Sequence, residues 1–397
     1  MWNPRLNHEI GSLCPGPYRS THQATLLLIS LIPRPQKRQM ATKVDATLGD
    51  GVNCPIWSLF LEHLRIEDPL GTAAVTCIGL ALLCWIVSII TSNYSQVDKL
   101  WSITPVVYAW ILVVGGGRDN TGGANEALPP RSLLMALVVT VWGVRLTYNF
   151  GRRDGYSWPR VWEGEEDYRW QLLREGKLLL LLRHPVAWHV FNFTFISFYQ
   201  NILLWLLVVP PMMIVHIVAT AEACGTATGS EARDSLLGLD YFFVISALAC
   251  IGIESIADDQ QFAFQSQKYE LLQCMRNKDT TAKSQLAGDY ADGFLQSGLF
   301  AIVRKPNYAA EQAFWFTFYG WSASAAAALV GRFEYNQLFA ATGSVLLILL
   351  FQLSGPFTEN ISCNKYPRYI DYQQRVPLYV PWLFGLPRGY SRRQHRD

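Results

Sequence analysis

Residues 298–315 decide the fold, and they read Gly-Leu-Phe-Ala-Ile-Val-Arg-Lys-Pro-Asn-Tyr-Ala-Ala-Glu-Gln-Ala-Phe-Trp. Pro306 has a fixed φ angle and no N–H to lose, so it suits the first position of a helix. The residues that follow, from Ala309 to Val330, are almost uncharged and numerous enough to cross a bilayer. This stretch therefore predicts a membrane-spanning helix at Ala309–Val330, with its first turn at Pro306.

Polar residues at the start of this helix predict a binding site. Asn307, Glu311 and Trp315 are spaced four residues apart and share one helix face. Glu311 lies about one turn inside the apolar run, where a carboxylate is costly unless it serves a buried polar site. Arg304 and Lys305 precede the helix, beside its free N–H groups, which favours an anion such as phosphate. The alternative is an interface where both cations contact lipid headgroups and Glu311 pairs with a neighbour. The shared face of Asn307 and Glu311 favours the binding site.

The composition indicates an all-α, polytopic membrane protein. Of the 397 residues, 50% are apolar and only 16% are charged, whereas soluble domains carry about 25% charged residues. The formal net charge of +2 is too small to indicate a nucleic-acid partner. The eight cysteines are scattered without a C-x-x-C pair, so neither a disulfide scaffold nor a metal site is expected.

Seven apolar segments are expected to form a bundle of about seven transmembrane helices in the lipid bilayer. Two prolines, Pro210 and Pro211, should kink or end the fourth segment, and the short apolar stretch Lys177–Leu182 should lie at the membrane interface. We expect a poorly structured N-terminal extension at residues 1–69, the helical domain at 70–385 and a basic tail at 386–397. The seven spans are Leu70–Thr91, Leu100–Gly117, Ser132–Asn149, Phe191–His216, Ser235–Ile256, Ala309–Val330 and Leu338–Gly355.

The basic residues predict the orientation of these spans. Segments 92–99, 150–190, 257–308 and 356–397 fall on one side and hold 21 of the 33 lysines and arginines. The loops on the other side hold only four. By the positive-inside rule, the basic loops and the C-terminus are expected to face the cytoplasm.

Four further stretches carry polar residues that a simple bundle does not need. Arg145 is a charge inside a predicted span, which makes it a functional candidate. Glu254 and Asp258 leave the fifth span on one helical face. Each stretch alone fits an ion pair equally well, but all of them lie at the predicted cytoplasmic mouth, which favours a single site. The remaining candidates are Tyr94, Asp98, Gln260, Glu359, Tyr366, Tyr369 and Tyr372.

Taken in order, these stretches resemble the steroid 5α-reductase-like membrane family over about residues 90–385. Two departures are mild: Lys305 stands where the family usually has His, and Ala310 where it often has Gly. The motifs that carry the resemblance are Tyr-Ser-x-Val-Asp-x-x-Trp at 94–101, Arg145-Leu146, Glu-Asp-Tyr-Arg at 166–169, Gln200 with Pro210, Glu-x-x-x-Asp-x-Gln at 254–260, and Gly-Leu-Phe…Arg-Lys-Pro-Asn-Tyr-x-x-Glu at 298–311.

The resemblance implies that a helical bundle holds NADPH. The sequence agrees, because no Gly-x-Gly-x-x-Gly follows a strand pattern. By this resemblance Asn307 and Glu311 hold the nicotinamide amide, while Arg304, Asp258, Gln260 and the tail tyrosines line the nucleotide. The full set expected at the cofactor is Arg145, Glu254, Asp258, Gln260, Arg304, Lys305, Asn307, Tyr308, Glu311, Glu359, Tyr366, Tyr369 and Tyr372.

The implied activity is reduction of a carbon–carbon double bond conjugated to a carbonyl, in a hydrophobic lipid-type substrate. A steroid, sterol, polyprenal or enoyl thioester fits equally. The reaction needs a hydride at the β-carbon and a hydrogen-bond donor for the enolate oxygen. Tyr94 and Asp98 are the candidates for that donor pair, and Glu311 is the third expected catalytic residue. The family habit implies the endoplasmic reticulum membrane.

Two other interpretations stay open at this level. Membrane methyltransferases of the isoprenylcysteine or phospholipid type use S-adenosylmethionine and share a similar Arg-x-Pro-x-Tyr helix start and tail. The stretches at 254–260 and 94–98 favour the reductase. A non-catalytic protein that has kept the fold is the third interpretation, against which Asn307, Glu311 and Asp258 argue because all three are present.

Overall fold

The computed structural model describes residues 68–116, 130–177, 179–220, 236–276, 287–330 and 335–381, which form helices and turns with no strand among them. The predicted all-helical class is therefore confirmed. Residues 1–67 and 382–397 lie outside this part of the chain, so the N-terminal extension and the basic tail stay predictions.

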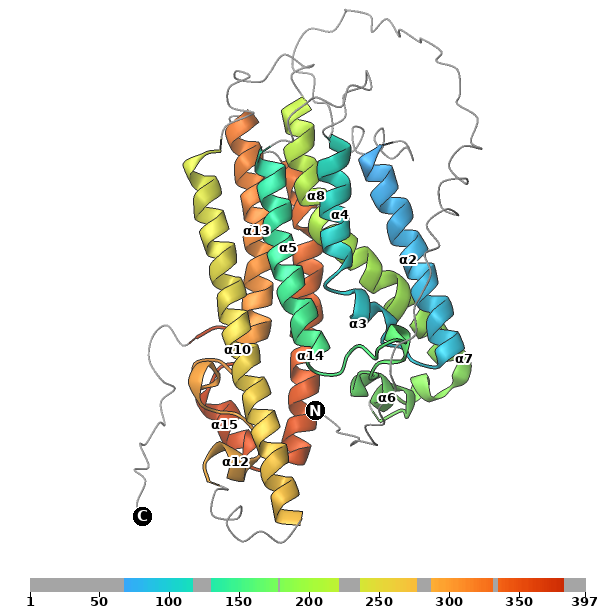
Figure 1. The fold of residues 1–397 in the computed structure, drawn as a ribbon, viewed down its shortest axis with the longest axis vertical. Helices are drawn as coiled ribbons and strands as arrows, with labels where there is room; N and C mark the ends of the chain where they lie inside the picture. The colour runs from blue at the N-terminus through green and yellow to red at the C-terminus, as the bar shows by residue number, and fades with distance from the viewer. Residues whose placement is uncertain are drawn as a thin grey trace, which may run out of the picture. The chain divides into compact units, whose positions relative to one another are not determined.

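The long helices run side by side, and α5, α10 and α13 are neighbours (Figure 1). Shorter helices lie at one end of the long ones, where the chain connects them. In order, the elements are α2 (Pro69–Thr91), α3 (Gln96–Leu100), α4 (Thr104–Gly116), α5 (Pro130–Gly151), η1 (Val161–Glu163), α6 (Tyr168–Arg174), η2 (Leu180–Arg183), α7 (Pro185–Phe191), η3 (Asn192–Tyr199), α8 (Gln200–Thr220), α10 (Gly238–Arg276), α12 (Asp289–Asp292), η5 (Gly298–Ala301), α13 (Pro306–Val330), η6 (Tyr335–Ala341), α14 (Thr342–Lys365) and α15 (Tyr369–Arg375).

Five described helical segments are long and apolar enough to cross a membrane: Pro69–Thr91, Pro130–Gly151, Pro185–Met213, Gly238–Arg276 and Leu338–Lys365. Each overlaps a predicted span. The predicted span at 100–117 corresponds to α4, which has only 13 residues. The predicted span at 309–330 corresponds to α13, which has 25 residues but is not among the five. The exact number of seven spans therefore stays a prediction.

The helix α13 begins at Pro306, as the sequence predicts. The helix α10 differs more, because it extends to Arg276 and has 39 residues, whereas the apolar pattern ends near Ile256. Helix formation beyond the apolar run needs no lipid contact, only neighbours for its polar side chains. As a result, Glu254, Asp258 and Gln260 lie on one continuous helix. That continuity fixes the spacing of these three side chains.

The helix α8 continues through Pro210 and Pro211 to Thr220, so it does not end at the prolines, and the expected alternative of a kink there stays a prediction. Pro210 has no N–H to donate to the carbonyl of Leu206. That carbonyl lies against Gly343 of the neighbouring α14, where an added Cβ would be 2.3 Å from the Leu206 oxygen. Close packing of α14 thus covers the weakened turn. The short helix η2 lies in the stretch expected at the interface, and Leu179, Leu180 and Leu181 are exposed there.

Candidate functional site

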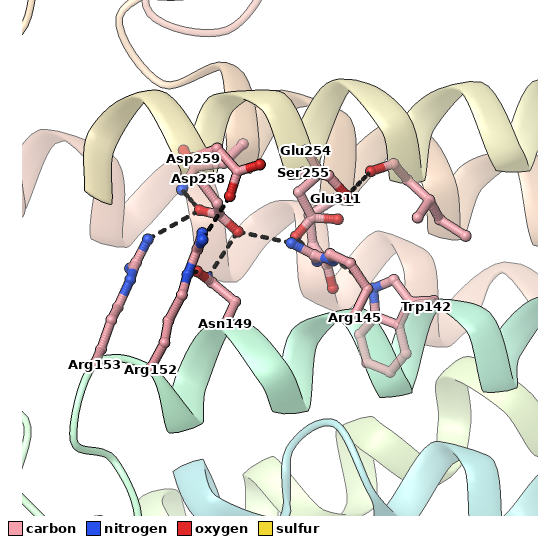
Figure 2. Close-up of polar contacts among 12 residues, drawn as sticks. Trp142, Arg145, Asn149, Arg152, Arg153, Glu254, Ser255, Asp258, Asp259 and Glu311 are labelled. Carbon is pink, nitrogen blue, oxygen red and sulfur yellow. Dashed lines mark hydrogen bonds and ion pairs between the residues drawn. The ribbon is translucent and has the colours of Figure 1, made fainter. Parts of the chain in front are cut away.

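The centre of the candidate site is the carboxylate of Asp258 on α10, which is 3% exposed. It accepts hydrogen bonds from Arg145 Nη1 at 2.7 Å and from Asn149 Nδ2 at 2.8 Å, both on α5. Arg153, just after α5, and Asn307, in the first turn of α13, each donate at 3.2 Å. Figure 2 shows the arginines reaching from α5 toward the carboxylates on α10. One side chain therefore joins three helices.

Two more carboxylates lie beside it, and we call Glu254, Asp258 and Glu311 the carboxylate cluster. Arg145 forms an ion pair with Glu254 Oε1 and interacts electrostatically with all three carboxylates. The second oxygen of Glu254, Oε2, is buried and has no hydrogen-bond partner in the described part of the chain. A buried acceptor without a partner costs about 1–3 kcal/mol. Such an unsatisfied group calls for an explanation, and a bound ligand is one that this site can offer.

Two tryptophans fix Glu311, which is 5% exposed. Trp142 Nε1 donates to Oε2 at 2.8 Å, and Trp315 Nε1 donates to Oε1 at 2.9 Å. The two rings meet edge to face, with centroids 4.9 Å apart. The sequence predicted that Trp315 shares a helix face with Glu311, but it did not indicate that Trp142 contacts Glu311. That residue lies in an apolar helix, where a tryptophan has the same pattern whether it fills the core or holds a carboxylate.

Arg304 has a different environment from the one predicted. Its Nε and Nη2 form two ion-pair contacts with Glu359 of α14, at 2.6 and 2.9 Å. Its Nη1 donates to the backbone carbonyl groups of Gln373, at 2.9 Å, and of Val376. The side chain is 11% exposed, so the expectation of an open position at an aqueous mouth is wrong. Sequence spacing could not reveal a carboxylate 55 residues away.

Glu359 is the centre of this second polar group, which we call the tail clamp (Arg304, Glu359, Tyr369 and Gln373). Besides Arg304, it accepts hydrogen bonds from the Tyr369 hydroxyl at 3.2 Å and from Gln373 Nε2 at 3.0 Å. Both carboxylate oxygens thus have two donors. The clamp holds α15 and the chain after it against the start of α13.

Other predicted nucleotide-lining residues are also engaged within the chain. The Tyr372 hydroxyl donates to the Phe300 carbonyl at 2.6 Å, and Tyr366 accepts from Lys268 Nζ at 3.0 Å. Gln260 Oε1 accepts from the Leu299 N–H at 3.0 Å. The structure does not test their roles in binding NADPH, but these contacts occupy the polar atoms that such roles need.

A further polar group surrounds Asp98 in α3, one of the two predicted donors. Trp170 Nε1 donates to Asp98 Oδ2 at 3.1 Å. Arg169 of α6 contacts Asp167 Oδ2 through Nε at 2.8 Å and Nη2 at 2.5 Å. Burial raises the pKa of Asp98, and the nearby negative charge of Asp167 raises it further. A carboxyl with a raised pKa can stay protonated and donate a hydrogen bond.

Arg169 lies near the start of α13. Its side chain is 28% exposed, and its charge acts on Lys305, the partly buried residue that precedes the helix. The motif at 166–169 therefore approaches the residues that begin α13.

Tyr94, the other predicted donor, is 7% exposed. Its ring meets Trp188 edge to face at 4.9 Å and lies below the guanidinium of Arg174. No described contact brings its hydroxyl to Asp98. Its backbone N–H donates to Glu166 Oε1 at 2.9 Å, so the motifs at 94–101 and 166–169 meet in space. The sequence analysis identified both motifs but assigned no functional role to Arg169.

These features define a helical membrane protein with an internal site of buried carboxylates, where α5, α10 and α13 meet. No group of three or more histidine, cysteine, aspartate or glutamate side chains suited to a metal occurs in the described ranges.

The chain belongs to the family described as "Protein of unknown function (DUF1295)", which matches residues 84–376. It is a family of membrane proteins related to steroid 5α-reductase. An uncharacterized protein from Schizosaccharomyces pombe is 31% identical over 336 residues, covering 82% of this chain and 86% of the relative. No solved structure gives a significant match.

Proposed function

We propose that this protein is a membrane oxidoreductase that uses NADPH to reduce a double bond conjugated to a carbonyl in a lipid-type substrate. The observation that carries the proposal is the carboxylate cluster, where buried Glu254 Oε2 lacks a partner. Within the cluster, Glu311 is the residue that the resemblance assigns to the nicotinamide, together with Asn307, and Asp258 is assigned to the nucleotide.

The chemistry of the cluster fits a nicotinamide. The carboxamide of that ring donates two N–H groups, and an unpaired carboxylate oxygen is a strong acceptor for one of them. Oxidised nicotinamide is a cation, while Glu254, Asp258 and Glu311 face one largely buried cation, Arg145, and the partly exposed Arg153. These carboxylate oxygens therefore favour the positive charge that develops on hydride transfer.

The residues of the cluster and those that contact them have the following roles in this proposal. When bound, NADPH supplies the hydride for the β-carbon of the substrate. Glu254 and Glu311 hold the carboxamide, and Asn307 orients it from the first turn of α13. Arg145 positions Glu254 and Asp258 by pairing with both. Trp142 and Trp315 prevent Glu311 from rotating, because each of its oxygens is held by an indole N–H.

Asp98 is our candidate for the donor that stabilises the enolate oxygen. A protonated carboxyl can donate a hydrogen bond to the substrate carbonyl, and this bond strengthens as negative charge develops on the oxygen. Its raised pKa supports this role. Tyr94 is the weaker candidate, since the described contacts turn its ring toward Trp188.

Direct binding tests the proposal. Purified protein in detergent is titrated with NADPH and, separately, with S-adenosylmethionine. We expect saturable binding of NADPH and none of S-adenosylmethionine. Binding of S-adenosylmethionine alone would instead support the methyltransferase interpretation, and binding of neither would support a non-catalytic protein.

We further propose that the C-terminus and the cofactor-binding end face the cytoplasm, in the endoplasmic reticulum membrane. The distribution of lysine and arginine supports this orientation. A glycosylation acceptor inserted after Pro381 is expected to stay unmodified in cells, with the same acceptor inserted after Arg118 as the matched control. Modification of the first and not of the second would reverse the orientation.

A further inference from the structure

A second set of buried polar side chains lies on helices that the carboxylate cluster does not use. The helix α2, at the edge of the bundle, packs against α4 and α8, and α4 packs against α8 (Figure 1). Cys77 Sγ of α2 donates to the Asn201 carbonyl of α8 at 3.4 Å, and Asn201 Nδ2 donates to the Ser197 carbonyl at 2.7 Å. The Cys77 thiol also lies near the Tyr108 hydroxyl of α4. We call Tyr108, Ser197 and Asn201 the neutral cluster.

Each residue of the neutral cluster has a buried polar atom without a hydrogen-bond partner in the described part of the chain. These atoms are the Tyr108 hydroxyl, Ser197 Oγ and Asn201 Oδ1, and none of the three residues is more than 1% exposed. The nearby thiol of Cys77 is only a weak hydrogen-bonding group. The hydrocarbon region of a bilayer offers no water to compensate such atoms. They are therefore available to bind a polar group of another molecule.

Ser197 differs from comparable hydroxyl groups in the same protein. Serine and threonine hydroxyls in helices commonly donate to the carbonyl four residues earlier. Ser246 and Ser255 of α10 do so, at 2.8 and 2.7 Å. Thr194 lies in the same π-helical segment as Ser197, η3, and donates to the Val190 carbonyl at 2.8 Å. Ser197 makes no such bond among the described residues, and π-helical turns occur frequently at functional sites.

The unpartnered atoms of the neutral cluster define the chemical class of a ligand. Asn201 Oδ1 only accepts hydrogen bonds, so it needs a ligand that donates one. The hydroxyls of Ser197 and Tyr108 can both donate, so they suit a ligand oxygen with two lone pairs. An alcohol has one O–H donor and two lone pairs, whereas a ketone or an ether can only accept. The three atoms are neutral, so they offer no counterion to a charged headgroup.

One helix separates the neutral cluster from lipid. On the inner face of α2, Cys77 is 4% exposed, whereas Ile78 and Leu83 on its outer face are 54% and 52% exposed. The helix α2 is also one of the segments that are apolar enough to cross a membrane. An apolar molecule with a single polar group reaches this depth from the bilayer, while a strongly polar one loses its hydration. The location therefore favours a lipid ligand.

We infer that the neutral cluster binds the hydroxyl group of a lipid alcohol. The alcohol donates to Asn201 Oδ1 and accepts from the hydroxyls of Ser197 and Tyr108. This inference deepens the proposed function, on which it rests only for the identity of the alcohol as the substrate. The substrate that it specifies carries a free hydroxyl group apart from the carbonyl that is conjugated to the double bond.

The test uses the full-length protein in phosphatidylcholine vesicles and photoreactive, tritiated lipid alcohols. One alcohol is a linear C16 chain and one has a fused-ring skeleton, and each is compared with its methyl ether, which cannot donate. We expect saturable labelling by at least one alcohol, on peptides from α2, α4 or the segment η3–α8, and weaker labelling by its ether. Ser197→Ala and Asn201→Leu should each weaken capture by roughly 3- to 10-fold, the range of one neutral hydrogen bond.

Thr194→Val is the matched control, because it removes a hydroxyl from the same segment that already has a partner. It should leave capture of the alcohol unchanged. Ser197→Ala should melt at or above the temperature of the wild type, since it removes a buried hydroxyl without a partner. Ser197→Ala therefore tests the inference even if Asn201→Leu folds poorly.

The outcomes separate the neutral cluster from the proposed function. If neither alcohol is captured more strongly than its ether, or if Ser197→Ala captures it as the wild type does, the cluster holds ordered water only. That result refutes the inference, while NADPH binding by the same protein leaves the proposed function standing. If an alcohol is captured in a Ser197-dependent way but NADPH does not bind, the alcohol site stands and the proposed function fails.

Discussion

The carboxylate cluster and the tail clamp each include a residue close to Pro306 in sequence, Glu311 and Arg304, and both are built on buried carboxylates, yet they differ in how many of their polar atoms have hydrogen-bond partners. In the tail clamp, Glu359 accepts four hydrogen bonds, two on each oxygen. In the carboxylate cluster, Glu254 Oε2 has none among the described residues. A satisfied polar network stabilises a fold, whereas a network with a buried unused acceptor suits a ligand.

This difference divides the roles within a single short motif. Arg304 turns back to the tail, while Asn307 and Glu311, one and two turns further on, face α5 and α10. Residues that are close in sequence thus have two different functions, stability of the fold and binding of the cofactor. The comparison predicts that changes in the clamp affect stability and that changes in the cluster affect cofactor binding.

The largest effect on stability is expected for Arg304→Ala. The substitution leaves Glu359, which is 4% exposed, without its cation, and breaking a buried ion pair costs about 3–5 kcal/mol. The free energy of unfolding in detergent measures this loss. NADPH affinity per folded molecule should stay near that of the wild type.

The double variant Arg304→Met with Glu359→Leu is the control for this prediction. Because no unpaired charge is left, it should recover much of the stability lost in Arg304→Ala. If Arg304→Ala instead has normal stability and a large loss of NADPH affinity, Arg304 binds the phosphate of the cofactor, as the sequence predicts.

The second prediction concerns Glu254→Gln in the carboxylate cluster. We expect the affinity for NADP+ to fall about tenfold and the affinity for NADPH to fall less, because the lost charge stabilises a cation. The free energy of unfolding should change little, since Arg145 keeps its ion pair with Asp258. Titrations with both nucleotides measure the ratio.

Asp240→Asn is the matched control at the other end of α5 and α10. Asp240 forms a buried ion pair with Arg131 at 2.9 Å and accepts from Trp321 at 2.6 Å. Its substitution should lower stability without changing the preference for NADP+. An equal change of preference in both variants would show that the effect of Glu254 is structural.

The third prediction separates charge from shape at Glu311. In Glu311→Gln, one indole N–H faces an amide NH2 group, so a buried donor loses its acceptor at a cost of about 1–3 kcal/mol. Trp142→Phe removes a donor to Glu311 but keeps the carboxylate. Both variants should melt at lower temperature, but only Glu311→Gln should also lose NADPH affinity. If Trp142→Phe loses as much affinity, positioning by the indole accounts for the effect.

The smallest effect is expected for Asp98→Asn, measured as stability against pH. Because the pKa of Asp98 is raised, the folded state binds more protons than the unfolded state above about pH 4. Its burial therefore destabilises the protein increasingly as pH rises through that raised pKa. Asp98→Asn should be more stable than the wild type near pH 8 and equal to it below about pH 4. A difference that does not change with pH would contradict the shift.

The sequence by itself determined the class and the local geometry of this protein. Low charge and repeated apolar segments specify membrane helices, and Pro306 specifies the start of α13 because its ring fixes the backbone there. The four-residue spacing of Asn307, Glu311 and Trp315 places them on one face, and Trp315 does contact Glu311. These features depend only on residues within a few positions of one another.

The tertiary structure alone decided which charges meet. Trp142 reaches Glu311 across 169 residues, and Arg304 reaches Glu359 across 55. It also decided that α8 continues past Pro210, where the packing of Gly343 covers a free carbonyl. A motif shows that a charge is present near a helix start, but its partner depends on which helices pack together. That packing is the physical reason why Arg304 pairs with Glu359, whereas Lys305, its neighbour, lies over the ring of Tyr308.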